Sequence, residues 1–116
     1  MGSIIKQAAY ALIAYILMIP ASKAGNYGIS GTITSMGCQT VNTICFVVLS
    51  GGADGPSGCS SNEVRWDSAS TPNGTAAVAQ LTAAYLAGKF VQINISNSCF
   101  AEFPSYPGMD YYIISG

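Results

Sequence analysis

The sequence contains no histidine, and only 8% of its residues are charged. Nucleophilic catalysis needs a base to activate the nucleophile, and histidine is the usual one. Zinc sites need imidazoles or closely spaced thiolates, and the chain has no CxxC pair either. The carboxylates show no paired arrangement typical of acid–base catalysis. We therefore expect a protein that is not an enzyme and that carries no metal and no cofactor.

Positive charge is also scarce, with four lysines and arginines in the whole chain. Beyond residue 24 the balance is two basic against five acidic residues, 2 − 5 = −3. Phosphate binding needs a basic patch, so we expect no nucleic-acid partner. The surface must instead form its polar contacts through hydroxyls and amides. The charged residues of this part are Arg65, Lys89, Asp54, Glu63, Asp67, Glu102 and Asp110.

The first 24 residues are typical of a secretory signal peptide. Lys6 precedes the apolar run "AAYALIAYILMI", whose 12 residues are shorter than the roughly 20 that span a bilayer. Ser22 and Ala24 occupy the small-residue positions of a cleavage site. Cleavage after Ala24 predicts a secreted or periplasmic chain of 116 − 24 = 92 residues, forming a single domain over 25–116 without a membrane span. An uncleaved membrane anchor is the alternative.

Four cysteines follow the predicted cleavage site. An even count in a small exported chain indicates two disulfides, and spacing alone leaves three pairings open. The residues are Cys38, Cys45, Cys59 and Cys99.

The remaining pattern predicts five strands and one helix. The helix is expected between Thr75 as its cap and Gly88 as its stop. Mainly β structure in the order β-β-β-α-β-β is typical of the OB-fold, a small Greek-key barrel. A small sandwich or an open α+β sheet gives a similar order. The expected strands are 27–36, 43–50, 63–68, 89–96 and 109–116.

An OB-fold barrel favours one disulfide pairing. Cys38 follows the first strand and Cys99 follows the fourth, and we expect these loops to meet at one end of the barrel. Cys45 opens the second strand, and Cys59 precedes the third strand in the same hairpin. The predicted pairs are Cys38–Cys99 and Cys45–Cys59, and each is expected to act as a structural staple.

Three stretches, "ISGTIT", "ICFVVLSGGADGPSGCSSNEVRW" and "AAYLAGKFVQINI", resemble the B subunits of AB5 toxins of the subtilase cytotoxin and pertussis-like type. The shared features are a Ser-Gly pair in strand 1, two cysteines around a Gly/Ser loop, a Trp, and a helix leading straight into an apolar strand. Small exported bacterial proteins of unknown function share much of this pattern. The resemblance implies a ring-forming OB-fold lectin: a homopentamer that binds sialylated host glycans and carries an enzymatic A subunit.

The resemblance also suggests sugar-contacting residues. Ser30 stands where the family's strand-1 serine bonds the sialic acid carboxylate, and a hydroxyl donates one hydrogen bond and accepts two. Asn94 lies at the end of the fourth strand, where the family has an aromatic residue. Tyr106 belongs to an aromatic region that forms either a binding rim or a cover over the open end of the barrel. We take Ser30, Asn94 and Tyr106 as the candidate ligand-binding residues.

Residues 75–88 contain no charged side chain, which is unusual for a helix on a small domain. In a toxin-like ring this helix faces its neighbours, whereas in a monomer its alanines lie against its own barrel. Two alternative functions follow from the monomer. One is a periplasmic or secreted OB-like domain that binds a protein or a small ligand, and the other is an inhibitor-type protein.

Overall fold

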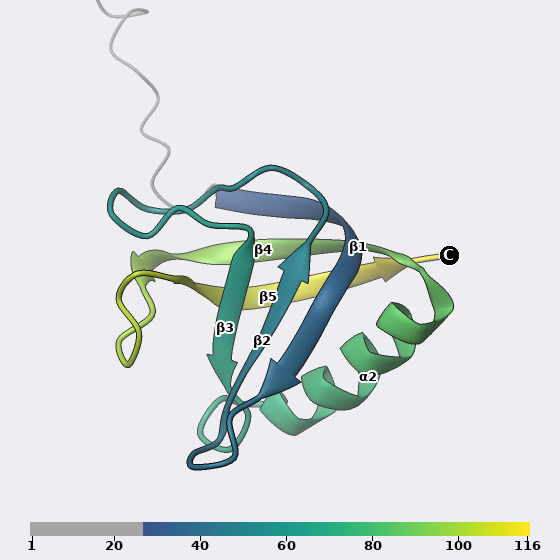
Figure 1. Cartoon of the computed structure of the whole chain (residues 1–116), viewed down its shortest axis with the longest axis horizontal. Coiled ribbons are helices and arrows are strands. Elements are labelled where there is room, and N and C mark those ends of the chain that lie inside the picture. The colour runs from purple at the N-terminus through teal and green to yellow at the C-terminus, as the bar shows by residue number, and fades with distance from the viewer. Residues whose placement is uncertain (1–26) are drawn as a thin grey trace, which may run out of the picture.

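The computed structural model describes residues 27–116, which fold into five strands and one helix (Figure 1). The strands close into a barrel in the order β1-β2-β3-β5-β4, and the helix α2 lies between β3 and β4 in the chain. This confirms the predicted fold class and the order β-β-β-α-β-β. The predicted signal peptide and its cleavage site lie outside the described residues. The bounds are β1 (Tyr27–Cys38), β2 (Ile44–Leu49), β3 (Glu63–Asp67), α2 (Gly74–Ala87), β4 (Phe90–Cys99) and β5 (Pro107–Ser115).

Strand β1 belongs to two ladders and bends between them. Its first half, from Tyr27 to Thr32, pairs with β4, and its second half pairs with β2 from Ile33 onward. Gly31, with φ 146°, lies just before this change of partner. Such a φ favours glycine, and a register shift between Ile33 and Ser35 increases the local twist. The bend lets β1 pair with β4 through its first half and with β2 through its second half, which closes the barrel.

The core follows the period-two alternation of the strands. Val91, Ile93 and Ile95 of β4 are buried, while Phe90 and Gln92, which alternate with them, are exposed. This strand therefore has one buried face and one outward face over 90–95. Full burial of each such aliphatic side chain contributes about 1.5–3 kcal/mol. Ile29, Ile33, Val47, Leu49, Val64 and Trp66 complete the strand side of the core.

Helix α2 packs against the core of the barrel with one narrow face. Gly74, Ala77, Leu81 and Ala84 are buried at helical spacing, and Trp66 of β3 donates its indole N–H to the Gly74 carbonyl oxygen at 3.1 Å. A Cβ at Gly74 would lie 2.7 Å from the carbonyl oxygen of Ser68, so only glycine allows this close approach. Within residues 27–116 no helix is long and apolar enough to cross a membrane.

The ends of α2 were predicted with mixed success. Gly88 ends the helix as expected, with φ 65° and its N–H bonded to carbonyl oxygens of the last turn. The expected cap at Thr75 is wrong, because the helix already begins at Gly74 after Asn73 in the left-handed conformation (φ 59°). The Thr75 hydroxyl instead donates to the Ser68 carbonyl oxygen at 3.1 Å.

The structure confirms two disulfides and corrects their pairing to Cys38–Cys45 and Cys59–Cys99. Strand β1 runs two residues beyond the predicted end, so Cys38 lies directly opposite Cys45. The Gln39 N–H donates to the Ile44 carbonyl oxygen at 2.9 Å. The adjacent Cys38–Cys45 pair is therefore of the closely spaced, non-hydrogen-bonded kind, with a Cα–Cα distance of 4.0 Å.

The predicted Cys38–Cys99 pair fails because β1 runs antiparallel to β4. The end of β4 lies beside Tyr27, at the start of β1, and therefore far along the strand from Cys38. The loop between β2 and β3 lies at this same end, since Leu49 pairs with Ile33 and not with Cys38. Cys59 in that loop is therefore the partner within reach of Cys99.

Candidate functional site

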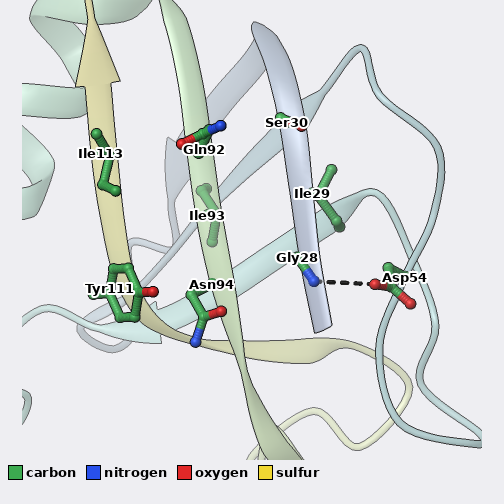
Figure 2. Close-up of a pocket in the computed structure, with 9 residues that line it drawn as sticks. All are labelled: Gly28, Ile29, Ser30, Asp54, Gln92, Ile93, Asn94, Tyr111 and Ile113. Atoms are coloured by element: carbon green, nitrogen blue, oxygen red, sulfur yellow. Dashed lines mark hydrogen bonds between the residues drawn. The ribbon is translucent and has the colours of Figure 1, made fainter. Parts of the chain in front are cut away.

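The outer face of β1, β4 and β5 carries a shallow pocket of about 370 Å³ (Figure 2). Two cross-strand rows build it. Asn94 of β4 lies between Gly28 and Tyr111, and Gln92 lies between Ser30 and Ile113. Gln92 and Asn94 alternate with the buried residues of β4, so both rows point outward from the barrel.

Side chains on this face are available for a ligand. The side chains of Ser30, Gln92 and Asn94 form no hydrogen bond with another group within residues 27–116. Tyr111 is 56% exposed and Ile113 is 49% exposed. Figure 2 shows the Tyr111 ring beside the Asn94 amide, with Gln92 and Ser30 farther along the face. Polar groups that can donate and accept thus lie next to an exposed aromatic ring.

One rim of the pocket is formed by Asp54 in the loop between β2 and β3. Its carboxylate accepts a hydrogen bond of 3.0 Å from the Gly28 N–H, and its backbone bridges to Ser61 across the loop. The disulfide from Cys59 to Cys99 holds the same loop against the end of β4. Asp54 is the one charged residue among the nine described residues that line the pocket, which therefore carries a negative charge.

Two of the three predicted ligand-binding residues meet in this pocket. Ser30 and Asn94 lie on neighbouring strands and point to the same side. Tyr106 lies elsewhere, in the loop between β4 and β5, where its ring centroid is 4.2 Å from the Arg65 guanidinium carbon. The ring of Phe103 covers the same guanidinium at 4.5 Å. We refer to Arg65, Glu63, Phe46, Phe103 and Tyr106 as the arginine clamp.

In the arginine clamp the cation is paired with a carboxylate of the same strand. The Arg65 guanidinium donates two hydrogen bonds to one oxygen of Glu63, at 2.6 and 2.9 Å. Phe46 adds a third ring, 5.6 Å from the guanidinium carbon. A cation enclosed by rings and paired with a carboxylate has little capacity left for a ligand. The clamp ties β3 to the loop between β4 and β5.

Asp67 has the one resolved pKa shift among the described titratable groups. The Thr43 hydroxyl, followed by the Ala69 N–H, donates to its carboxylate and lowers its pKa from 3.8 to about 2. The Ser70 N–H adds a further donor. Asp67 therefore fixes the turn between β3 and α2 to the start of β2, away from the open face.

Sequence reasoning did not place Gln92, Ile113 or Asp54 in a pocket, and it named Tyr111 only within the aromatic region that forms either a binding rim or a cover. Gln92 was detectable, because its alternation places it on the same face as Asn94. Tyr111 and Tyr112 are adjacent, and only the register of β5 shows which of them faces outward. Asp54 comes from a loop with no regular pattern, so no sequence signal placed it beside Gly28.

Neither a metal centre nor a known relative adds to this picture. Within residues 27–116 no three His, Cys, Asp or Glu side chains gather to hold a metal ion. The likeness to AB5 toxin B subunits stays a prediction that rests on the stretches quoted above. In comparisons with known proteins, no family model, no curated protein and no solved structure matches the chain.

Proposed function

We propose that the protein is an exported, non-catalytic binding domain whose open face on β1, β4 and β5 recognises a glycan. The observation that carries this proposal is the exposed Tyr111 ring beside the side-chain amides of Asn94 and Gln92, which have no hydrogen-bond partner in the part of the chain that the structure describes. Its two disulfides are consistent with an extracellular or periplasmic location. Cleavage of the signal peptide after Ala24 is part of the proposal.

The face offers the two kinds of contact that a sugar ring needs. One side of a sugar ring is rich in C–H groups and packs on an apolar surface, which Tyr111 and Ile113 supply. The hydroxyls at its edge need both donors and acceptors. The amides of Asn94 and Gln92 and the hydroxyl of Ser30 provide both. The fourth strand lacks the aromatic that the toxin family has, and Tyr111 of β5 takes over that role in the proposal.

Charge directs the choice of glycan. Among the described residues that line the pocket, Asp54 is the one that is charged, and it would repel the carboxylate of a sialic acid. A neutral glycan avoids this repulsion, and its hydroxyls donate to the carboxylate. We therefore propose a neutral glycan in place of the sialylated one that the toxin resemblance implies.

A glycan array followed by calorimetry on the best neutral oligosaccharide tests the proposal. Tyr111→Ala should weaken binding about tenfold or more, and Tyr111→Phe should keep most of it because the ring remains. Ser30→Ala tests the hydroxyl, and Ser35→Ala, on an exposed position of the same strand outside the pocket, is its matched control. The proposal would be refuted if no neutral glycan on the array bound the protein, or if Tyr111→Ala bound the glycan as tightly as the wild type.

A homopentamer that carries an A subunit is a further part of the proposal. Its support is α2, which has no charged residue and leaves Leu86 81% exposed. Light scattering after size exclusion should give a mass near five protomers. Leu86→Glu should then yield monomers, while Val41→Glu, at an 89% exposed loop position, should leave the ring intact. A monomeric wild type would refute the ring and leave the glycan site to be tested separately.

A further inference from the structure

A second region with unused binding capacity lies between β5 and α2. Strand β5 pairs with β4 from Met109 to Ser115, but it meets β3 only at Gly108, opposite Arg65. Alternate residues of 109–115 therefore present backbone N–H and C=O groups on the edge away from β4, without a strand partner among the described residues. Such an edge is a template for an added strand.

This edge is one wall of a groove, and α2 is the other. Two hollows of about 380 and 340 Å³ lie along it, and both are lined by β5 on one side and by small helix residues on the other. Gln80 belongs to both hollows, and its side chain accepts a hydrogen bond from the Tyr112 hydroxyl. This bridge crosses the groove beside both hollows. The helix residues are Ala76, Ala77, Gln80, Ala83, Ala84 and Ala87.

The ends of the groove carry opposite charges. Asp110 lines one hollow, and Lys89 lines the other. Phe90 pairs with Ser115, so Lys89 lies beside the C-terminal end of β5. Neither residue forms an ion pair within the described part of the chain. The six positions from Asp110 to Ser115 span about 17–20 Å of extended chain.

We propose that this groove binds the C-terminal segment of a partner polypeptide as an added strand parallel to β5. Its backbone pairs with the free edge, its terminal carboxylate points to Lys89, and its upstream part passes Asp110. The alanine wall favours small or apolar side chains at alternate positions. Gln80 and Tyr112 meet across the groove, so the added strand has to displace this bridge when it pairs with the edge of β5.

Peptide libraries of six residues, synthesised once with free C-termini and once as C-terminal amides, test the groove on the purified oxidised protein. Free-acid peptides should bind more tightly than their amides. Lys89→Gln should remove this preference, weakening the acids about two- to fivefold and leaving the amides unchanged. Equal binding of acids and amides to the wild type would contradict the proposed direction of the strand.

Two matched pairs of variants locate the peptide. Ala83→Leu narrows the groove and should abolish binding, while Ala79→Leu, exposed on the other side of the same helix, should not. Tyr112→Phe removes the bridge to Gln80 and should tighten binding about two- to tenfold. Tyr85→Phe, which removes a bond to the Thr34 carbonyl oxygen instead, should have no effect.

The outcomes separate this groove from the glycan face. Asn94→Ala should leave peptide binding unchanged, because Asn94 lines the face and not the groove. Absence of any binding peptide, or equal binding to Ala83→Leu and wild type, would overturn the groove proposal and leave the glycan proposal standing. A wild-type dimer that Ala83→Leu converts to a monomer would assign the groove to a second copy and overturn it as well.

Discussion

The arginine clamp and the open face contain the same kinds of residue in different roles. In the clamp, rings lie 4.2 and 4.5 Å from the Arg65 guanidinium carbon, and Glu63 accepts its hydrogen bonds. On the open face, Tyr111 stands beside amides that have no partner among residues 27–116. Aromatic and polar composition therefore does not distinguish a binding site from a structural cluster. The distinction is whether the chain satisfies its own polar groups.

The largest expected effect comes from opening the end of the barrel that holds the clamp. Replacing both Cys59 and Cys99 by alanine frees a loop of separation 40 and should cost about 4 kcal/mol of unfolding free energy in the chain-entropy model. Replacing Cys38 and Cys45, with separation 7, should cost about 2 kcal/mol. Chemical denaturation measures both. Equal losses, or a larger loss for the short loop, would contradict this ranking.

Removing the cation of the clamp should cost less. Arg65→Met keeps much of the side-chain stem but leaves Glu63 and the rings without their partner, for an expected loss of about 2 kcal/mol. Arg65→Lys restores the charge but not the planar stacking, so its loss should be intermediate. Urea unfolding gives both values, and glycan affinity should be unchanged. Lost affinity at full stability would make the clamp a ligand site.

The two tyrosines give the most direct contrast. Tyr106→Ala should lower the unfolding free energy by about 1 kcal/mol and keep glycan binding, because its ring covers Arg65. Tyr111→Ala should reverse the pattern, with lost binding and a stability change below about 0.5 kcal/mol. Parallel calorimetry and thermal melts check both variants. If both tyrosines affected the same property, the distinction between the two regions would fail.

The smallest effect concerns the carboxylate that the chain saturates with donors. The pKa of Asp67 is lowered from 3.8 to about 2 in the folded state, so its contribution is complete above pH 4 and fades as the pH falls toward 2. The stability advantage of wild type over Asp67→Asn should therefore shrink across this window. Thr43→Val removes the largest cause of the shift and should flatten the wild-type pH dependence. A difference that stays constant from pH 5 to pH 2 would contradict the assignment.

The sequence was sufficient for the barrel but not for its cross-links. The element order predicted the barrel, because five strands with one helix between the third and the fourth are typical of the OB-fold. The disulfide pairing depended on where β1 ends, and "GC" before a polar loop gave no reason to extend the strand to Cys38. Two added residues were enough to place Cys38 opposite Cys45.

The site was half predictable for a similar reason. Asn94 and Ser30 lie on strands whose outward positions follow from their patterns. Tyr111 and Tyr112 exchange faces with a one-residue slip. The pairing of Asn94 with Tyr111, next to a register shift that skips Asp110 of β5, places Tyr111 outward. Tyr106 was misleading because Arg65, which fills its ring face, is distant in the sequence and meets it only in the folded chain.

The single tryptophan gives the barrel a built-in optical probe. The Trp66 indole is 2% exposed, and its N–H is bonded to the first residue of α2. Its fluorescence emission should therefore shift to longer wavelength when the helix leaves the barrel, whether or not the strands have separated. Sugar at the open face should leave this emission unchanged, since Trp66 does not line that pocket. Trp66 fluorescence should therefore report the docking of α2 independently of ligand binding at the open face.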